Sequence, residues 1–313
     1  MLIHWDDVPP IDLARGDLGG LRRRLGAASG APRLGLSRYD LGPGQRPMPV
    51  HVHGDEEEIF VVLEGSGVSF EKDTAHPIAA GDIVRYPAEG RPHTVVAGPE
   101  GMVVLAFGSG STSHLTYLPR AGAMWAGPRW IPADGPSPFA LEMEAGPLEL
   151  PAAAEASDRP DTIAHVDDIP AREPRRRGDV GQVARELGDA VGCTLAGLSE
   201  ITVDPGCLSN PPHCHSAEDE LFVVLEGDGA LELLHPDGSA ESHPVHAGHV
   251  ISRPAGTGVA HTFGAGDGGL RLLAYGHRDS SDMCFYPRSG KVSIRGLKTI
   301  FRVQQVDYWD GEE

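Results

Sequence analysis

The chain has 313 residues, of which 40% are hydrophobic and 23% charged, and its formal net charge is −19 at pH 7. This length is sufficient for about two domains that each bury their own core. A surface this acidic repels phosphate backbones and anionic lipids, and no apolar run is long enough to span a membrane, so we expect neither a nucleic-acid nor a membrane partner.

The sequence repeats itself once along its length. HWDDVPPI at 4–11 resembles HVDDIPAR at 165–172, and GDLGGLRRRLGAASG at 16–30 resembles GDVGQVARELGDAVG at 178–192. Further on, AGDIVRYPAEGRPH at 80–93 resembles AGHVISRPAGTGVAH at 247–261. The repeat predicts an N-terminal domain at 1–122, a linker at 123–160 partly packed on the domains, a C-terminal domain at 161–280 and an extension at 281–313.

The N-terminus and the cysteines bear on the compartment. MLIHWDDVPP carries acids where a secretory signal would carry Lys or Arg and then an apolar stretch. All four cysteines lie in the second half and form no CxxC pair: Cys193, Cys207, Cys214 and Cys284. A disulfide framework would be expected in both copies of a duplicated secreted domain. We therefore expect a cytoplasmic protein with reduced thiols.

Each copy has the pattern of an all-β domain. HxDD near residues 4 and 165 is typical of a structural turn or cap, and the stretches near 17–25 and 179–187 are the plausible helical turns. After them come short segments rich in β-branched residues and bounded by Gly, Pro or Asp, such as IFVVLEG, DIVRYP and MVVLAFG. Many short strands predict a sandwich or barrel, and nearly continuous apolar runs indicate barrels that pack against each other.

The residues with metal chemistry recur at one offset. His51, His53 and Glu58 correspond to His213, His215 and Glu220, since 213 − 51 = 162 and the other two pairs give the same difference. Residues i and i+2 of a strand project to the same face, so both histidines of a pair point inward. Glu58 begins the next strand and is preferred over its acidic neighbours because it alone matches Glu220.

A fourth ligand is expected from a more distant strand, at His93 in the first copy and His261 in the second. Three imidazoles and a carboxylate suit one divalent transition metal per domain and leave a coordination position open. We favour iron, while Mn, Ni, Cu, Co or Zn also fit these ligand types. The alternative is a former metal site kept as a hydrogen-bonded polar core.

These residues bear a resemblance to the cupin superfamily. Its first motif is matched by Gly44, His51, His53, Glu58 and Gly65, and again by Gly206, His213, His215, Glu220 and Gly227. Its second motif is matched by Gly81, Pro87, Gly90 and His93, and again by Gly248, Pro254, Gly256 and His261. The gaps differ by one or two residues from the usual spacing, and alanine replaces the Asn that often ends the second motif.

The whole chain resembles a bicupin. The resemblance implies two tandem double-stranded β-helix (jelly-roll) barrels with short helical turns and a metal inside each. The copies differ near the ligands, since Arg38-Tyr39 and Arg85-Tyr86 have no equivalents at 200–201 and 252–253. An arginine there would suit a carboxylate or enolate substrate, although an outward salt bridge is an equal alternative. Cys214 stands between two ligands, and strand alternation points it away from the metal.

Three hypotheses for the function follow, and none assigns a catalytic residue. The first is an iron-dependent dioxygenase acting on a small organic acid, enol or phenol that chelates the metal. The second is a non-redox metalloenzyme such as a decarboxylase, isomerase or hydrolase. Bicupins that decarboxylate oxalate use an acid on a lid loop, which nothing here resembles, although Glu89 or Glu100 could serve. The third is a non-catalytic metal or ligand-binding protein. The assembly is either a monomer with an internal pseudo-dimer or a homo-oligomer.

Overall fold

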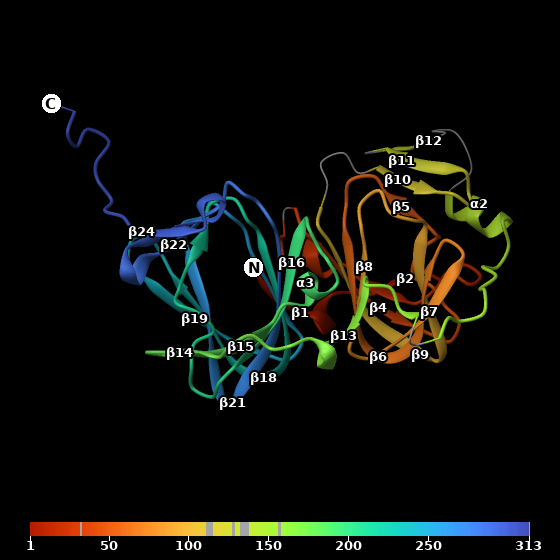
Figure 1. Cartoon of the computed structure of the whole chain (residues 1–313), viewed down its shortest axis with the longest axis horizontal. Helices are drawn as coiled ribbons and strands as arrows, with labels where there is room; N and C mark the ends of the chain where they lie inside the picture. Colours follow the sequence, from red (N-terminus) through yellow and green to blue (C-terminus); the bar gives the residue numbers. More distant parts are fainter. Residues whose placement is uncertain (32, 111–114, 127–128, 132–137, 156–157, 313) are drawn as a thin grey trace.

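The structure is a computed structural model that describes residues 1–31, 33–110, 115–126, 129–131, 138–155 and 158–312. It consists of two β-barrels side by side, with few and short helices, as Figure 1 shows. In the described residues each barrel has an eight-stranded sheet and a smaller four-stranded sheet, and neighbouring strands of these sheets pair antiparallel. The predicted all-β bicupin fold is confirmed.

The first barrel is built around two long strands, β6 and β9, which pair along most of their length. Its large sheet contains β2 (Ile11–Asp12), β3 (Leu21–Arg23), β4 (Gly35–Leu41), β6 (Glu58–Glu71), β7 (Thr74–Ala79), β8 (Asp82–Tyr86), β9 (His93–Gly108) and β13 (Ile163–His165). Its small sheet contains β5 (Val52–His53), β10 (Leu115–Leu118), β11 (Ala123–Ala126) and β12 (Arg129–Ile131).

The second barrel repeats this plan around β18 and β21. Its large sheet contains β1 (Leu2–His4), β14 (Arg175–Arg177), β15 (Val180–Arg185), β16 (Ala196–Val203), β18 (Glu220–Leu234), β19 (Ala240–His246), β20 (His249–Arg253) and β21 (Ala260–His277). Its small sheet contains β17 (Cys214–His215), β22 (Met283–Tyr286), β23 (Lys291–Ile294) and β24 (Thr299–Arg302). In Figure 1 each small sheet lies at the upper end of its barrel.

The helices are short, and two of them lie further along the chain than expected. They are α1 (Leu25–Ala28), α2 (Pro138–Glu144) and α3 (Leu187–Ala190), with 3-10 turns at Trp5–Asp7, Val166–Asp168, Pro287–Ser289 and Arg295–Leu297. The stretches 17–25 and 179–187, predicted as helical turns, instead contain β3 and β15, and the helices begin where these stretches end. Pairing with β4 and β16 gives these backbones hydrogen-bond partners that a local pattern does not reveal.

The barrels exchange one strand each. The N-terminal β1 pairs with β20 of the second barrel, and β13, which begins the second half of the chain, pairs with β8 of the first. His4 and His165 each cap the 3-10 turn after the exchanged strand by accepting a hydrogen bond from the backbone two residues on. These strand pairings cross the expected limits at residues 122 and 161, and the division at those limits stays a proposal.

Glycine makes room for both exchanged strands. Gly81 and Gly248 have φ angles of +92° and +93°, and a Cβ there would lie 2.6 Å from Nε2 of His165 and 2.3 Å from Nε2 of His4. Any side chain would therefore be strained and would also clash with the incoming histidine. The repeated AG dipeptide at 80–81 and 247–248 is thus required by the strand exchange.

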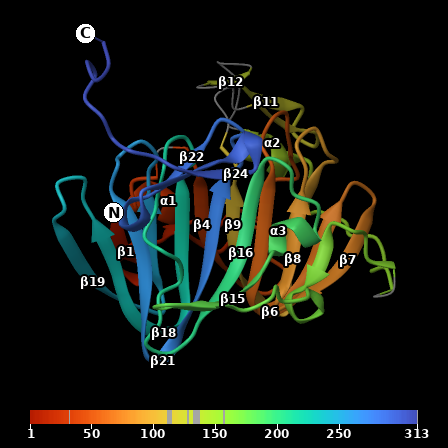
Figure 2. The same cartoon turned by 60° about the vertical axis from the view of Figure 1, so that its left-hand side comes forward.

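A continuous apolar core joins the two barrels. It takes Ile59, Val61 and Leu105 from the first barrel and Leu221, Val223 and Leu273 from the second, among others. Phe107 and Tyr275 meet across the junction with ring centroids 4.8 Å apart. Strands at this junction bury one face in their own barrel and the other against the neighbouring barrel. This explains why their sequences are apolar without alternation. Figure 2 shows the two barrels from a second direction.

A fully buried carboxylate also binds one barrel to the other. Glu57 is 0% exposed, and its Oε2 lies 2.8 Å from Nε of Arg85. The same carboxylate accepts hydrogen bonds from the backbone of Thr194, Leu195 and Ala196 in the second half, at 3.2–3.3 Å. At the equivalent position Asp219 accepts a hydrogen bond from Nε of Arg33, at 3.0 Å. Each half therefore places an acid against the other half.

The segment after the first barrel packs onto it. β11 and β12 extend the small sheet, and Glu142 of α2 is buried against Arg46 and Arg120 at 3.1 and 3.3 Å. The parts of the predicted linker at 127–128, 132–137 and 156–157 lie outside the described residues. Among the described helices, none combines the length and the apolar character that a membrane crossing would need.

We predict that Glu57→Gln destabilises the protein strongly. The substitution leaves the guanidinium of Arg85 buried without its counter-charge, which costs about 3–5 kcal/mol in the free energy of unfolding. Urea unfolding measures this loss. Glu173→Gln, at an exposed position, is the matched control and should change the unfolding free energy by no more than about 0.5 kcal/mol. Equal midpoints for the two variants would contradict the prediction.

Candidate metal centres

The first candidate site brings together all four residues expected from the sequence. His53 lies in β5, Glu58 begins β6 and His93 begins β9, while His51 forms an antiparallel bridge with His93. One ligand atom from each residue lies within 4.8 Å of the others. Oε2 of Glu58 is 3.3 Å from Nε2 of His51, 3.4 Å from Nε2 of His53 and 3.3 Å from Nε2 of His93.

The outer ring nitrogen of each histidine in this cluster has a fixed partner. Nδ1 of His51 lies 2.8 Å from the carbonyl of Pro49, and Nδ1 of His93 lies 2.9 Å from that of Arg91. A carbonyl only accepts, so Nδ1 donates and the lone pair of Nε2 faces the cluster. Nδ1 of His53 lies 3.0 Å from the Thr116 hydroxyl. The ring orientations needed for metal binding are therefore already set.

The charges of this cluster are strongly perturbed. Burial opposes ionisation of Glu58, but the charge on His53 and the close approach of Nε2 from all three histidines hold its pKa well below the usual range. Burial also opposes protonation of His53, yet the charge of Glu58 raises the pKa of His53 to about 9. Burial lowers the pKa of His93 to about 4. One proton on His53 thus balances the carboxylate when no cation is present.

The second candidate site contains the equivalent residues in a looser arrangement. Oε2 of Glu220 lies 3.2 Å from Nε2 of His261 and 3.6 Å from Nε2 of His215, and His213 bridges to His261 as in the first barrel. The ligand atoms of His213, Glu220 and His261 form one group within 4.8 Å. His215 belongs instead to a group with His213 and Cys284.

The position of His215 has a specific cause. Its Nδ1 lies 2.7 Å from Oδ2 of Asp282, whose Oδ1 accepts hydrogen bonds from three backbone amides at 216–218. Burial would lower the pKa of His215, but hydrogen bonds to Asp282 and Cys284 and the charge of Glu220 raise it to about 11. A carboxylate that orients a histidine from behind is a common support for a metal ligand.

In the described residues several inward-facing atoms lie close to another ligand atom without forming a hydrogen bond. Nε2 of His53, Nε2 of His261 and Oε2 of Glu220 are buried without a hydrogen bond. Buried polar atoms are normally satisfied, and imidazole nitrogens converging on a carboxylate are the donors that a divalent transition metal takes. Both donor sets therefore fit such a metal, and the hydrogen-bonded polar core alone leaves these atoms unexplained.

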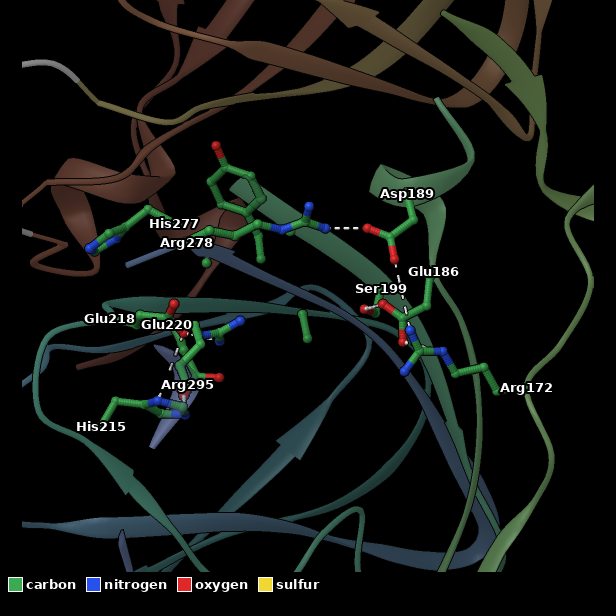
Figure 3. Close-up of a pocket in the computed structure, with 14 residues that line it drawn as sticks. Arg172, Glu186, Asp189, Ser199, His215, Glu218, Glu220, His277, Arg278 and Arg295 are labelled. Carbon is green, nitrogen blue, oxygen red and sulfur yellow. Dashed lines mark hydrogen bonds and ion pairs between the residues drawn. The ribbon is translucent and has the colours of Figure 1, made fainter. Parts of the chain in front are cut away.

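Two pockets reach the second cluster. One, of about 480 Å³, runs from His215, Glu218 and Glu220 towards Arg172, Glu186 and Asp189, as Figure 3 shows. Its cations are matched by acids: Arg172 with Glu186, Arg278 with Asp189 and Arg295 with Glu218.

The other pocket, of about 590 Å³, opens between β17 and the extension after residue 280. His213, His215 and Cys284 lie at its base, and its cationic side chains come from Arg175, Lys291, Arg295 and Lys298. We call this the cationic pocket.

The arginines expected near a substrate have structural roles. Arg85 pairs with Glu57, and Arg38 pairs with Asp40 at 2.8 Å and lies over the ring of Trp5. Tyr86 is buried and stacks on the ring of His93, with centroids 3.9 Å apart.

The acids considered for a lid lie on the first barrel. Glu89 is exposed, and Glu100 lines a separate pocket with Gly65 and Met102 that contains none of the eight candidate ligands.

Cys214 pairs with Phe285, while its neighbour His215 pairs with Cys284, so Cys214 and Cys284 belong to different register positions.

Sequence reasoning missed the residues of the extension. Asp282, Cys284, Lys291 and Lys298 all contribute to the second site, but they were assigned only to a C-terminal extension. A signal was present, because the chain has three lysines and two of them fall within eight residues of each other there. Arg175 also lines the cationic pocket.

We predict that Asp282→Asn lowers the pKa of His215 from about 11 by about 1–3 units, because a charged partner is replaced by a neutral one. NMR titration of the His215 ring in metal-free protein measures the shift. Asp279→Asn is the control, since the Asp279 carboxylate bonds to Ser281 in the same loop. An unchanged titration of His215 in the Asp282 variant would show that this contact does not hold the proton.

The comparisons with known proteins agree with this geometry. The cupin domain family matches residues 37–108 and 199–275. The fold is similar to oxalate decarboxylase in a structure of its substrate binding mode, at 18% identity and a TM-score of 0.62 over 90% of this chain and 78% of that one. The Bacillus subtilis enzyme at pH 4.6 gives 19% identity and a TM-score of 0.59 over 88% and 75%.

These identities show a shared fold alone. No curated protein matches the sequence. The two family matches contain all eight candidate ligands, and each match corresponds to one barrel. The chain is therefore a tandem bicupin of the cupin superfamily.

Proposed function

We propose that this bicupin is a metal-dependent enzyme that decarboxylates a small organic acid at the second cluster. The observation that carries the proposal is the cationic pocket over that cluster. In a chain of net charge −19, it gathers two of the three lysines together with Arg175 and Arg295. Such a pocket attracts anions locally although the protein as a whole repels them.

Three of the four cations of the pocket are available to a ligand, since Arg295 pairs with Glu218. In the part of the chain that the structure describes, no carboxylate pairs with Arg175, Lys291 or Lys298. Lys291 lies over the Tyr286 ring, 5.4 Å from its centroid. The acid in the pocket, Asp282, is occupied by His215 and backbone amides. The other pocket that reaches the cluster has its cations paired, so an anionic substrate is expected to enter through the cationic pocket.

We propose that His213, His215, Glu220 and His261 hold one divalent metal and that His51, His53, Glu58 and His93 hold another. A metal at the second cluster would act as a Lewis acid on a carboxylate oxygen. The lysines and arginines would bind the remaining anionic oxygens and fix the acid across the pocket. Asp282 would keep His215 oriented. A non-redox reaction leaves the metal identity open, and Mn(II) is the metal named for the similar oxalate decarboxylase.

The oxygenase favoured from the sequence fits this pocket less well. A catechol, flavonol or diketone would be expected to bind among apolar and aromatic side chains. The cationic pocket has Tyr286 and Ile300 among mainly charged and polar residues. The similarity to an oxalate decarboxylase also favours decarboxylation, although at 18% identity it supports the fold and not the substrate. We therefore place decarboxylation before oxygenation.

We predict that metal-loaded protein releases CO₂ from one or more small di- or keto-acids, oxalate included, without net oxygen consumption. Protein loaded separately with Mn, Fe, Co or Zn is assayed for both gases at once. Chelation should abolish turnover, and His213→Ala should lower it more than the matched His51→Ala. Oxygen uptake equal to product formed would favour the oxygenase. Tight binding of the acids without turnover would favour a binding protein.

We also predict that Lys291→Gln and Lys298→Gln each raise KM for the acid by about tenfold or more. The loss of a charge-assisted contact of about 1.5 kcal/mol corresponds to that factor. Lys72→Gln is the matched control, because Lys72 is the remaining lysine and lies exposed on the first barrel. Steady-state kinetics at low and high salt provide the measurement. An unchanged KM in both pocket variants would argue against this route of substrate binding.

A further inference from the structure

We propose that Cys284 is a thiolate ligand of the metal at the second cluster, so that the two barrels of this chain select different metals. The inference rests on the metal site proposed above and adds a donor that the first barrel lacks. Both barrels have three histidines and one glutamate, and only the second has a thiol among the grouped ligand atoms.

The position of the thiol follows from strand pairing. In the small sheet, β22 pairs with β17 so that Cys284 lies opposite His215. Residues opposite each other in an antiparallel pair present their side chains on the same face. One ligand atom each from His213, His215 and Cys284 lies within 4.8 Å of the others. Cys284 is 8% exposed and lines the cationic pocket together with His215 and Tyr286.

The first barrel has a different residue at the same register position. There β10 pairs with β5 so that Thr116 lies opposite His53. The Thr116 hydroxyl contacts Nδ1 of His53 at 3.0 Å and holds the ring from behind. In the second barrel Asp282 performs this task at 2.7 Å. Because Asp282 orients His215, the residue opposite His215 does not have to hold the ring. That residue is Cys284.

A second observation at this cluster also fits cation binding. His261 is 2% exposed, and its Nε2 faces the cluster without a hydrogen bond, as does Oε2 of Glu220. In the first barrel Nε2 of His51 and Nε2 of His93 both lie 3.3 Å from Oε2 of Glu58. In the wider second cluster Nε2 of His261 and Oε2 of Glu220 face each other at 3.2 Å without the geometry of a hydrogen bond. His213 belongs both to their group and to the group that contains Cys284, so the two groups share one ligand at which a cation would bind.

The binding step releases two protons. The S–H bond of Cys284 breaks as the sulfur–metal bond forms from the thiolate, the imidazolium of His215 loses the proton on Nε2, and both protons pass to buffer. Thiolate is a soft donor that favours Co, Zn or Cu over Mn, whereas three imidazoles and a carboxylate accept all of them. The second site is expected to prefer a thiophilic metal and the first site to be less selective.

Cobalt(II) tests the proposal without turnover. The full-length protein is loaded with Co²⁺ to two equivalents, and the near-ultraviolet spectrum is examined for a thiolate-to-cobalt charge-transfer band. All four cysteines lie in the second half, so the band would report a thiol there. We expect the band in the wild type and in the neighbouring control Cys214→Ser, and its loss in Cys284→Ser. Competition between zinc and manganese should show the zinc preference of the second site falling about 10–100-fold in Cys284→Ser.

The outcomes separate this inference from the proposed reaction. Two bound cobalt ions without the band, or a band that survives Cys284→Ser, would overturn the thiolate ligand and leave the decarboxylase proposal standing. One or no bound cobalt, with the second cluster empty, would overturn the metal site and this inference with it. The band together with absence of CO₂ release would support Cys284 while contradicting the reaction. Unfolding midpoints of the serine variants confirm that each is folded.

Discussion

The backbone bridge between the first and fourth candidate ligands is the constraint on which both sites depend. In the first barrel the amides and carbonyls of His51 and His93 exchange hydrogen bonds of 3.1 and 2.8 Å, and in the second those of His213 and His261 exchange bonds of 3.2 and 2.8 Å. Such a pair places two side chains on one face at close range. Two histidines that are far apart in the chain are thereby brought close together in each barrel. Glu58 or Glu220 completes the ligand set from the neighbouring strand.

Around this shared bridge the two barrels have diverged. The first barrel is covered by the small sheet that β10–β12 form with β5, and a threonine supports its second histidine. The second barrel is covered by β22–β24, which bring an aspartate, a thiol and two lysines to the cluster. The same inner cage thus faces different surroundings. Since metal preference and substrate charge depend on those surroundings, a single chain has two sites with different expected chemistry.

The junction between the barrels explains why both are kept in one chain. Each half contributes a strand to the other sheet, and each places an acid, Glu57 or Asp219, against the opposite half. The continuous apolar core at the junction is buried only when both barrels are present. Glu57 is adjacent to Glu58, so the residue that joins the barrels directly precedes a candidate ligand. The start of β6 therefore carries both a contact that joins the barrels and a candidate ligand of the first cluster.

The sequence alone was sufficient for the duplication, the all-β fold and the eight candidate ligands, because i, i+2 alternation and a constant offset are local or repeated properties. The helical turns predicted at 17–25 and 179–187 were wrong, because these stretches contain the strands β3 and β15, which pair with β4 and β16. The sequence did not reveal the exchange of β1 and β13, the structural roles of Arg38 and Arg85, or the approach of Cys284 and the lysines. Those features depend on which distant strands pair and in which register. Only the tertiary structure decides that pairing, because the stability of a β-sheet comes from contacts between strands that are far apart in the sequence.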